Sequence, residues 1–75
     1  MRTQEFDMSK EVDNIEVGKV TIVKMVRMDT TNTEEAKKFA EEYARENGLK
    51  LFSVYMGLGH WYTGMTGRYA YFYKA

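Results

Sequence analysis

The clearest pattern of apolar and polar positions in the chain predicts one amphipathic helix. Its apolar residues recur at spacings of three and four, which places them on one helical face: Ala36, Phe39, Ala40, Tyr43 and Ala44. A capping box at the start of the helix is supplied by Asn32 with Glu35, or by Thr31 with Glu34. Gly48 suits the left-handed residue that follows a helix. We therefore predict a helix over residues 33–47.

Three other segments have the composition of β-strands. Residues 20–28 are rich in β-branched side chains and are apolar on both faces, which is typical of a strand covered on both sides. Simple alternation places Val20, Ile22, Val26 and Met28 on one face of this strand, with Val23 and Met25 on the other. Residues 49–56 and 68–74 are predicted as two further strands. The glycine-rich connection over residues 57–67 is longer than hairpin loops usually are, which is typical of functional or partly disordered loops.

The order of these elements predicts a single α+β domain over residues 1–75. A β-α-β-β arrangement would form a three- or four-stranded sheet with one helix packed on one face. If the strands that flank the helix run parallel, their connection should be right-handed. Residues 1–16 leave two interpretations open, a short edge strand or a flexible acidic arm.

Alternation in the two C-terminal strands predicts one face covered by the helix and one aromatic face. The covered face takes Phe52, Val54, Met56, Ala70 and Phe72. The opposite face takes Leu49, Leu51, Tyr55, Tyr69, Tyr71 and Tyr73. Since one helix cannot cover both faces, we expect the second face to bind a partner, together with His60, Trp61 and Tyr62 in the loop. The alternatives are a homodimer interface, a different macromolecule, or a cover formed by the N-terminal segment.

The charge distribution adds a second interpretation of the same hairpin. The net charge is zero, which by itself argues against a nucleic-acid binder, but residues 47–75 contain no acid. Their cations are Lys50, Arg68 and Lys74, which are candidate phosphate contacts. Stacking aromatics beside cations on an open sheet suit single-stranded nucleic acid. Binding of single-stranded nucleic acid is therefore the alternative function.

One strand resembles the aromatic strand of the RNA-recognition motif in the order of its side chains. In residues 67–72, glycine and arginine are followed by an aromatic, a small, an aromatic and an apolar residue. The resemblance covers about six residues, and residues 20–28 lack the aromatic residue of the family's other motif. The sequence is therefore not assigned to that family.

Residues that would carry catalysis or bind a metal are scarce in this chain. There is no cysteine and one histidine, His60, so a usual zinc site is not expected. The glycines precede a predicted strand rather than a helix, so they match no phosphate-binding loop. No apolar run reaches the roughly 20 residues of a membrane span, and no secretory signal is present, so we expect a cytoplasmic protein. We predict that the chain is not an enzyme and needs no cofactor. We expect a non-enzymatic interaction module, of adaptor or inhibitor type, that binds a protein partner or a second copy of itself.

Overall fold

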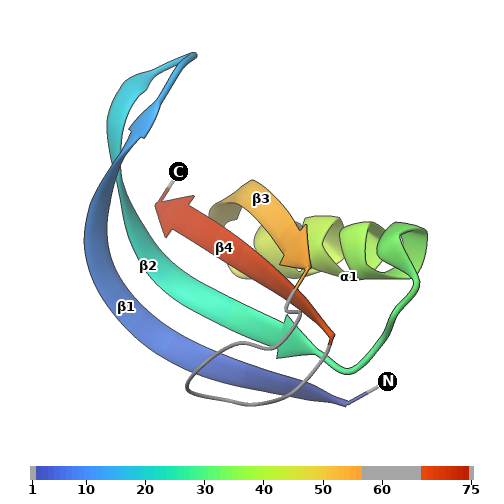
Figure 1. Cartoon of the computed structure of the whole chain (residues 1–75). Helices are drawn as coiled ribbons and strands as arrows, with labels where there is room; N and C mark the ends of the chain where they lie inside the picture. The colour runs from blue at the N-terminus through green and yellow to red at the C-terminus, as the bar shows by residue number, and fades with distance from the viewer. Residues whose placement is uncertain (1, 57–66, 75) are drawn as a thin grey trace.

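The chain forms a four-stranded antiparallel sheet with one helix on one face. A computed structural model describes residues 2–56 and 67–74 of the chain. The elements follow in the order β1 (Thr3–Asn14), β2 (Gly18–Met28), α1 (Thr33–Glu46), β3 (Leu49–Met56) and β4 (Arg68–Lys74), shown in Figure 1. The strand order across the sheet is β1-β2-β4-β3. The predicted α+β class, with one helix packed on one face of a small sheet, is confirmed.

Strand β4 lies between β2 and β3 in the sheet. Both neighbours pair with it in antiparallel fashion, so β2 and β3 run parallel to each other without being adjacent. The helix α1 makes the crossover between them. Strand β1 forms a hairpin with β2 and occupies one edge of the sheet, so the segment that left two interpretations open is an edge strand from Thr3 onward.

The helix begins and ends at the residues that its sequence signals indicate. The backbone N–H of Glu35 donates to the Asn32 side chain at 3.0 Å, and the N–H of Asn47 donates to the Tyr43 carbonyl at 3.0 Å. Gly48 follows with a φ of 64°, the left-handed conformation that glycine adopts without strain. The predicted helix agrees with α1 to within one residue at its end.

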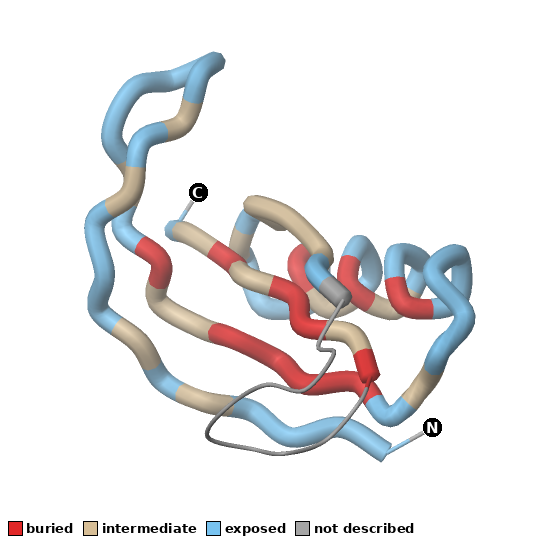
Figure 2. The backbone as a smooth tube through the Cα atoms, viewed as in Figure 1, coloured by how far each residue is buried: buried red, intermediate tan, exposed pale blue. Residues whose placement is uncertain are grey.

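The hydrophobic core lies between α1 and the two middle strands. Its buried members are Val26, Met28, Ala36, Ala40, Ala44, Ala70 and Phe72. The three alanines repeat every four residues along α1, so the helix approaches the sheet closely along a line of small side chains. Figure 2 shows this burial concentrated along β2, β4 and the inner face of α1. Larger side chains such as Phe39 and Leu49 pack around the margin of this core.

A bulge in β3 changes which side chains face the helix. Leu51 pairs with Phe72, but Ser53 pairs with Tyr71, so Phe52 is an extra residue in β3. An extra residue reverses the alternation on one side of the bulge. Leu51 therefore packs against the helix-side core, as does Leu49, and our placement of both on the tyrosine face was wrong. Phe52 was also misplaced: its ring meets that of Tyr73 edge to face at 6.4 Å, on the face away from α1.

A second bulge, in β2, has the same effect. Ile22 pairs with Tyr73, whereas Lys24 pairs with Phe72, which leaves Val23 as the extra residue. Tyr73 and Phe72 are consecutive and point to opposite faces, so Ile22 lies on the face away from the helix. Our placement of Ile22 together with Val26 on one face was therefore wrong.

The β1–β2 hairpin extends beyond the rest of the sheet. Pairing between β2 and β4 begins at Ile22, so among the described strands the end of the hairpin is paired only within β1 and β2. Figure 1 shows it as a curved ribbon that projects past the C-terminal end of β4. The Asn14 side chain shapes the turn by accepting the backbone N–H groups of Glu16 at 2.8 Å and Val17 at 3.2 Å.

Side-chain contacts link the edge strand β1 both to β2 and to the helix. The Lys24 ammonium lies 2.5 Å from the Asp7 carboxylate, and the Tyr43 hydroxyl donates to the Glu5 carboxylate. Partial burial of the phenol, and then the contact with Glu5, raise the pKa of Tyr43 to about 12. The helix is thus connected to β1 by a hydrogen bond that requires a neutral phenol.

We expect alkaline pH to weaken this connection. Since the pKa of Tyr43 is raised in the folded chain, its contribution to stability is complete below about pH 10 and is lost as pH rises through about 12. The free energy of unfolding, measured by urea titration, should fall over that interval in the natural chain. Tyr43→Phe should remove the part of this decrease in unfolding free energy that comes from ionisation of the Tyr43 phenol. An unchanged alkaline profile in Tyr43→Phe would contradict the assignment.

Gly67, next to β4, should tolerate no side chain. Its φ is 138°, and a Cβ there would lie 2.7 Å from the Met28 carbonyl oxygen. We expect Gly67→Ala to lower the free energy of unfolding by about 3 kcal/mol, because it adds a backbone clash to conformational strain. The matched control is Gly48→Ala, where φ is 64° and an added Cβ would have none of the described neighbouring atoms within 4 Å. We expect Gly48→Ala to lower the free energy of unfolding by about 1–2 kcal/mol. Equal losses in the two variants would refute the clash.

Candidate partner-binding site

The tyrosine face of the sheet is exposed only in part. Tyr69 is 1% exposed, so its side chain offers almost no surface to a partner, contrary to our expectation. Tyr71 and Tyr73 are half-buried, and Tyr55 is 48% exposed. The rings of Tyr55 and Tyr71 meet edge to face at 5.4 Å. The accessible part of this face therefore lies toward β3 and the end of β4. His60, Trp61 and Tyr62, which we predicted beside it, lie outside the described residues.

An open groove of about 450 Å³ lies between the hairpin turn and the aromatic end of the sheet. Its walls include Asp13, Ile15 and Glu16 from the hairpin, and Phe52, Tyr55 and Tyr73 from β3 and β4. The strong curvature of β1 and β2, visible in Figure 1, carries the hairpin turn away from the plane of the other strands. The bulge in β3 turns Phe52 toward Tyr73 on this face. Sheet curvature and one extra residue together create the groove.

Two of the three large apolar side chains that are exposed among the described residues line this groove. The three are Ile15, which is fully exposed, Val17 at 59% and Tyr55 at 48%. Ile15 and Tyr55 line the groove, and Val17 belongs to the same turn as Ile15. Exposed apolar side chains are ordinary when scattered, but a concentration at one concave site indicates a binding surface.

The groove carries negative charge beside its aromatic rings. The described residues that line it include the carboxylates of Asp13 and Glu16 and no lysine or arginine. Lys19 lies opposite Asp13 across the hairpin, and its ammonium is 3.4 Å from the Glu11 carboxylate. Tyrosine and phenylalanine rings attract cations, and carboxylates strengthen that attraction. The groove therefore suits apolar groups accompanied by a cationic one.

The three cations that we proposed as phosphate contacts do not form one group. Arg68 lies on the helix side of β4, where its guanidinium donates to the Thr31 carbonyl at 2.7 Å and the Thr33 hydroxyl at 3.3 Å. It thereby holds the segment that leads into α1. Lys74 shares that side of β4 by alternation, whereas Lys50 pairs with Tyr73 on the tyrosine face. A continuous basic strip along the tyrosines is therefore absent from the described hairpin strands.

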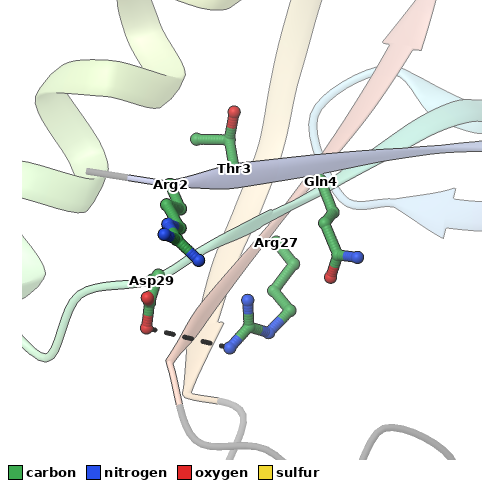
Figure 3. Close-up of a pocket in the computed structure, with 5 residues that line it drawn as sticks. All are labelled: Arg2, Thr3, Gln4, Arg27 and Asp29. Atoms are coloured by element: carbon green, nitrogen blue, oxygen red, sulfur yellow. Dashed lines mark ion pairs between the residues drawn. The ribbon is translucent and has the colours of Figure 1, made fainter.

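A second pocket, also of about 450 Å³, lies at the other end of the β1–β2 pair. Figure 3 shows the five residues that line it: Arg2, Thr3, Gln4, Arg27 and Asp29. The charged ends of Arg2, Arg27 and Asp29 are directed toward one another, and an Arg27 guanidinium nitrogen lies 3.8 Å from the Asp29 carboxylate. Sequence analysis overlooked this site. The available signal was an arginine placed directly between two apolar residues, Val26 and Met28.

Within residues 2–56 and 67–74, no three histidine, aspartate or glutamate side chains gather as a metal site would require. No helix in that part of the chain is both long and apolar enough to cross a membrane. Comparison of the chain with models of known protein families, with curated proteins and with solved structures found no match.

Proposed function

We propose that the chain is a non-enzymatic interaction module that binds a protein partner through the groove between the hairpin turn and β3. The observation that carries this proposal is that two exposed large apolar side chains, Ile15 and Tyr55, line the same groove, with the exposed Val17 in the same hairpin turn as Ile15. Burying one isoleucine-sized side chain is worth about 1.5–3 kcal/mol relative to leaving it in water. A partner that covers this site would therefore gain a substantial part of its binding energy from few side chains.

The aromatic wall supports a role in recognition. Tyrosine combines a large contact area with few rotatable bonds, and it is enriched among the residues that dominate protein interfaces. Tyr55 and Tyr73 are each packed edge to face against a neighbouring ring, which limits their motion before binding. Rings that are already ordered lose less conformational entropy when a partner arrives.

The carboxylates favour a different protein over a second copy of this chain or a nucleic acid. A twofold interface places the same patch on both subunits, so Asp13 and Glu16 would face the same charges on the partner. Phosphate groups would meet the same repulsion. A protein segment that carries apolar side chains and a lysine or arginine would complement both the rings and the acids.

We expect Tyr55→Ala to weaken partner binding about 30-fold, which corresponds to about 2 kcal/mol. The stability of the free chain should change little, because about half of Tyr55 is exposed to solvent. A photo-crosslinker placed at Ile15 should first capture the partner in an extract of cells that express the chain. The same crosslinker at Lys38, which is exposed on α1, is the matched control. Titration calorimetry with the purified partner then gives the affinities.

Two results would contradict this proposal. One is equal capture from Ile15 and Lys38, which would mean that the groove is not the contact surface. The other is an unchanged affinity in Tyr55→Ala. Loss of folding in Tyr55→Ala, seen as a large drop in the unfolding midpoint, would instead make this residue part of the core.

We expect mixed single-stranded oligonucleotides to give no saturable binding at physiological salt. The acids at the groove oppose phosphates, and the Arg68 guanidinium is engaged by Thr31 and Thr33. Fluorescence anisotropy of labelled oligonucleotides, at low and moderate salt, measures this. Saturable binding that weakens with salt would support the nucleic-acid alternative, because phosphate contacts are salt-dependent.

A further inference from the structure

Three aromatic rings line the groove, and two of them stand at right angles to each other. The ring planes of Phe52 and Tyr73 make an angle of 84°, with their centroids 6.4 Å apart. Tyr55 adds a third ring from the same strand as Phe52. Phe52 and Tyr73 are half-buried and Tyr55 is exposed, so part of each residue remains accessible. Since the face of an aromatic ring attracts a cation, a cation at this corner can contact more than one ring.

The hairpin adds two carboxylates to the same groove. Asp13 and Glu16 are both exposed and both line it. Lys19 lies opposite Asp13 across the hairpin, but its ammonium is 3.4 Å from the Glu11 carboxylate. Neither Asp13 nor Glu16 forms an ion pair within the part of the chain that the structure describes. The groove thus combines uncompensated negative charge with aromatic rings, and both favour a cation.

The apolar part of the groove determines which cation fits best. A primary ammonium is strongly hydrated and has three N–H donors that need acceptors. A trimethylammonium has no N–H donor, and its methyl groups gain from burial against rings and aliphatic side chains. The fully exposed Ile15 supplies an aliphatic side chain in the same groove. An alkylated ammonium therefore matches the lining better than a primary one.

We infer that the groove binds a methylated lysine side chain of a partner protein, with the alkylated ammonium against Phe52, Tyr55 and Tyr73. The inference rests on the proposed function, because it names the chemical group by which that partner enters the groove. The volume of about 450 Å³ accommodates the head group and its methylene chain. The partner's neighbouring apolar residues contact Ile15 and Val17, which a small quaternary ammonium alone leaves in water.

The direct test titrates the full chain with acetyl-alanyl-trimethyllysyl-leucine amide and follows backbone amide signals by NMR. We expect saturable shifts at Ile15 and Tyr55 and none at Lys38, which lies on α1. A matched peptide carries a tert-butyl group, in which carbon replaces the charged nitrogen at nearly the same size. It should bind about fivefold more weakly, because the attraction between the cation and the rings is lost. The peptide with unmodified lysine should also bind more weakly, because its ammonium stays hydrated.

Variants of the chain separate the contribution of the rings from that of the carboxylates. Tyr55→Leu keeps an apolar side chain but removes the ring, so it should weaken binding of the trimethyllysine peptide about fivefold and leave the tert-butyl peptide nearly unchanged. Asp13→Asn should weaken the trimethyllysine peptide about twofold, since the carboxylate is exposed and its attraction is screened by water. Glu42→Gln is the matched control, because it removes the same charge from the exposed face of α1.

Several outcomes would overturn the inference. Equal binding of the trimethyllysine and tert-butyl peptides would show that the groove recognises apolar volume and not a cation. Equal binding of the lysine peptide would show that methylation is not read. Equal losses in Asp13→Asn and Glu42→Gln would assign the attraction to overall charge. Choline that binds as tightly as the trimethyllysine peptide would make a small quaternary ammonium the ligand.

Failure of this inference and failure of the proposed function have different signatures. If the trimethyllysine peptide gives no saturable shifts, but the crosslinker at Ile15 captures a partner that Tyr55→Ala binds more weakly, only the methylated lysine is wrong. If capture from Ile15 and Lys38 is equal, the proposed function itself fails, and the inference that depends on it fails as well.

Discussion

The structure depends on the packing of one alanine-lined helix face against the middle of the sheet. Ala36, Ala40 and Ala44 allow α1 to lie close to Val26 and Phe72, and together these residues exclude water from that side. A sheet of four strands has two faces, however, and a single helix can cover only one of them. Every candidate binding feature of this chain follows from that limitation, because both pockets involve the side away from α1.

The bulges in β3 and β2 decide which side chains lie on the side away from α1. Without an extra residue at Phe52, simple alternation would place Leu49 and Leu51 beside the tyrosines and create a broad aliphatic patch. The bulge moves both leucines into the helix-side core and replaces them with the ring of Phe52, packed against Tyr73. The exposed surface becomes smaller and more aromatic, which favours selective recognition over non-specific association.

The side away from α1 has opposite charge at its two ends. At the projecting hairpin, Asp13 and Glu16 accompany the apolar residues of the groove. At the start of the β1–β2 pair, Arg2 and Arg27 outnumber Asp29. With a net charge of zero, the chain has no overall attraction for one class of partner, so recognition depends on local fields of this kind.

The local elements could be read from the sequence because they are determined by neighbouring residues. The stripe from Ala36 to Ala44 with the Asn32 cap defined α1, and the alternation of the last strand placed Tyr71 and Tyr73 away from the helix. That a tyrosine face would lie on the side away from the helix also followed from one helix and several strands, but its partial burial did not, since Tyr69 is only 1% exposed.

The sites themselves were decided by tertiary structure. A bulge is defined by the register of a strand against its neighbour, so Phe52 and Ile22 could be placed only when β4 was paired. The groove joins a hairpin turn to β3, and the second pocket joins Arg2 to Arg27, in each case across distant segments of chain. Sequence periodicity reflects the geometry of a single helix or strand. Strand pairing, sheet curvature and the approach of charged side chains to one another are determined by contacts between elements. For this physical reason the fold could be predicted from the sequence and the sites could not.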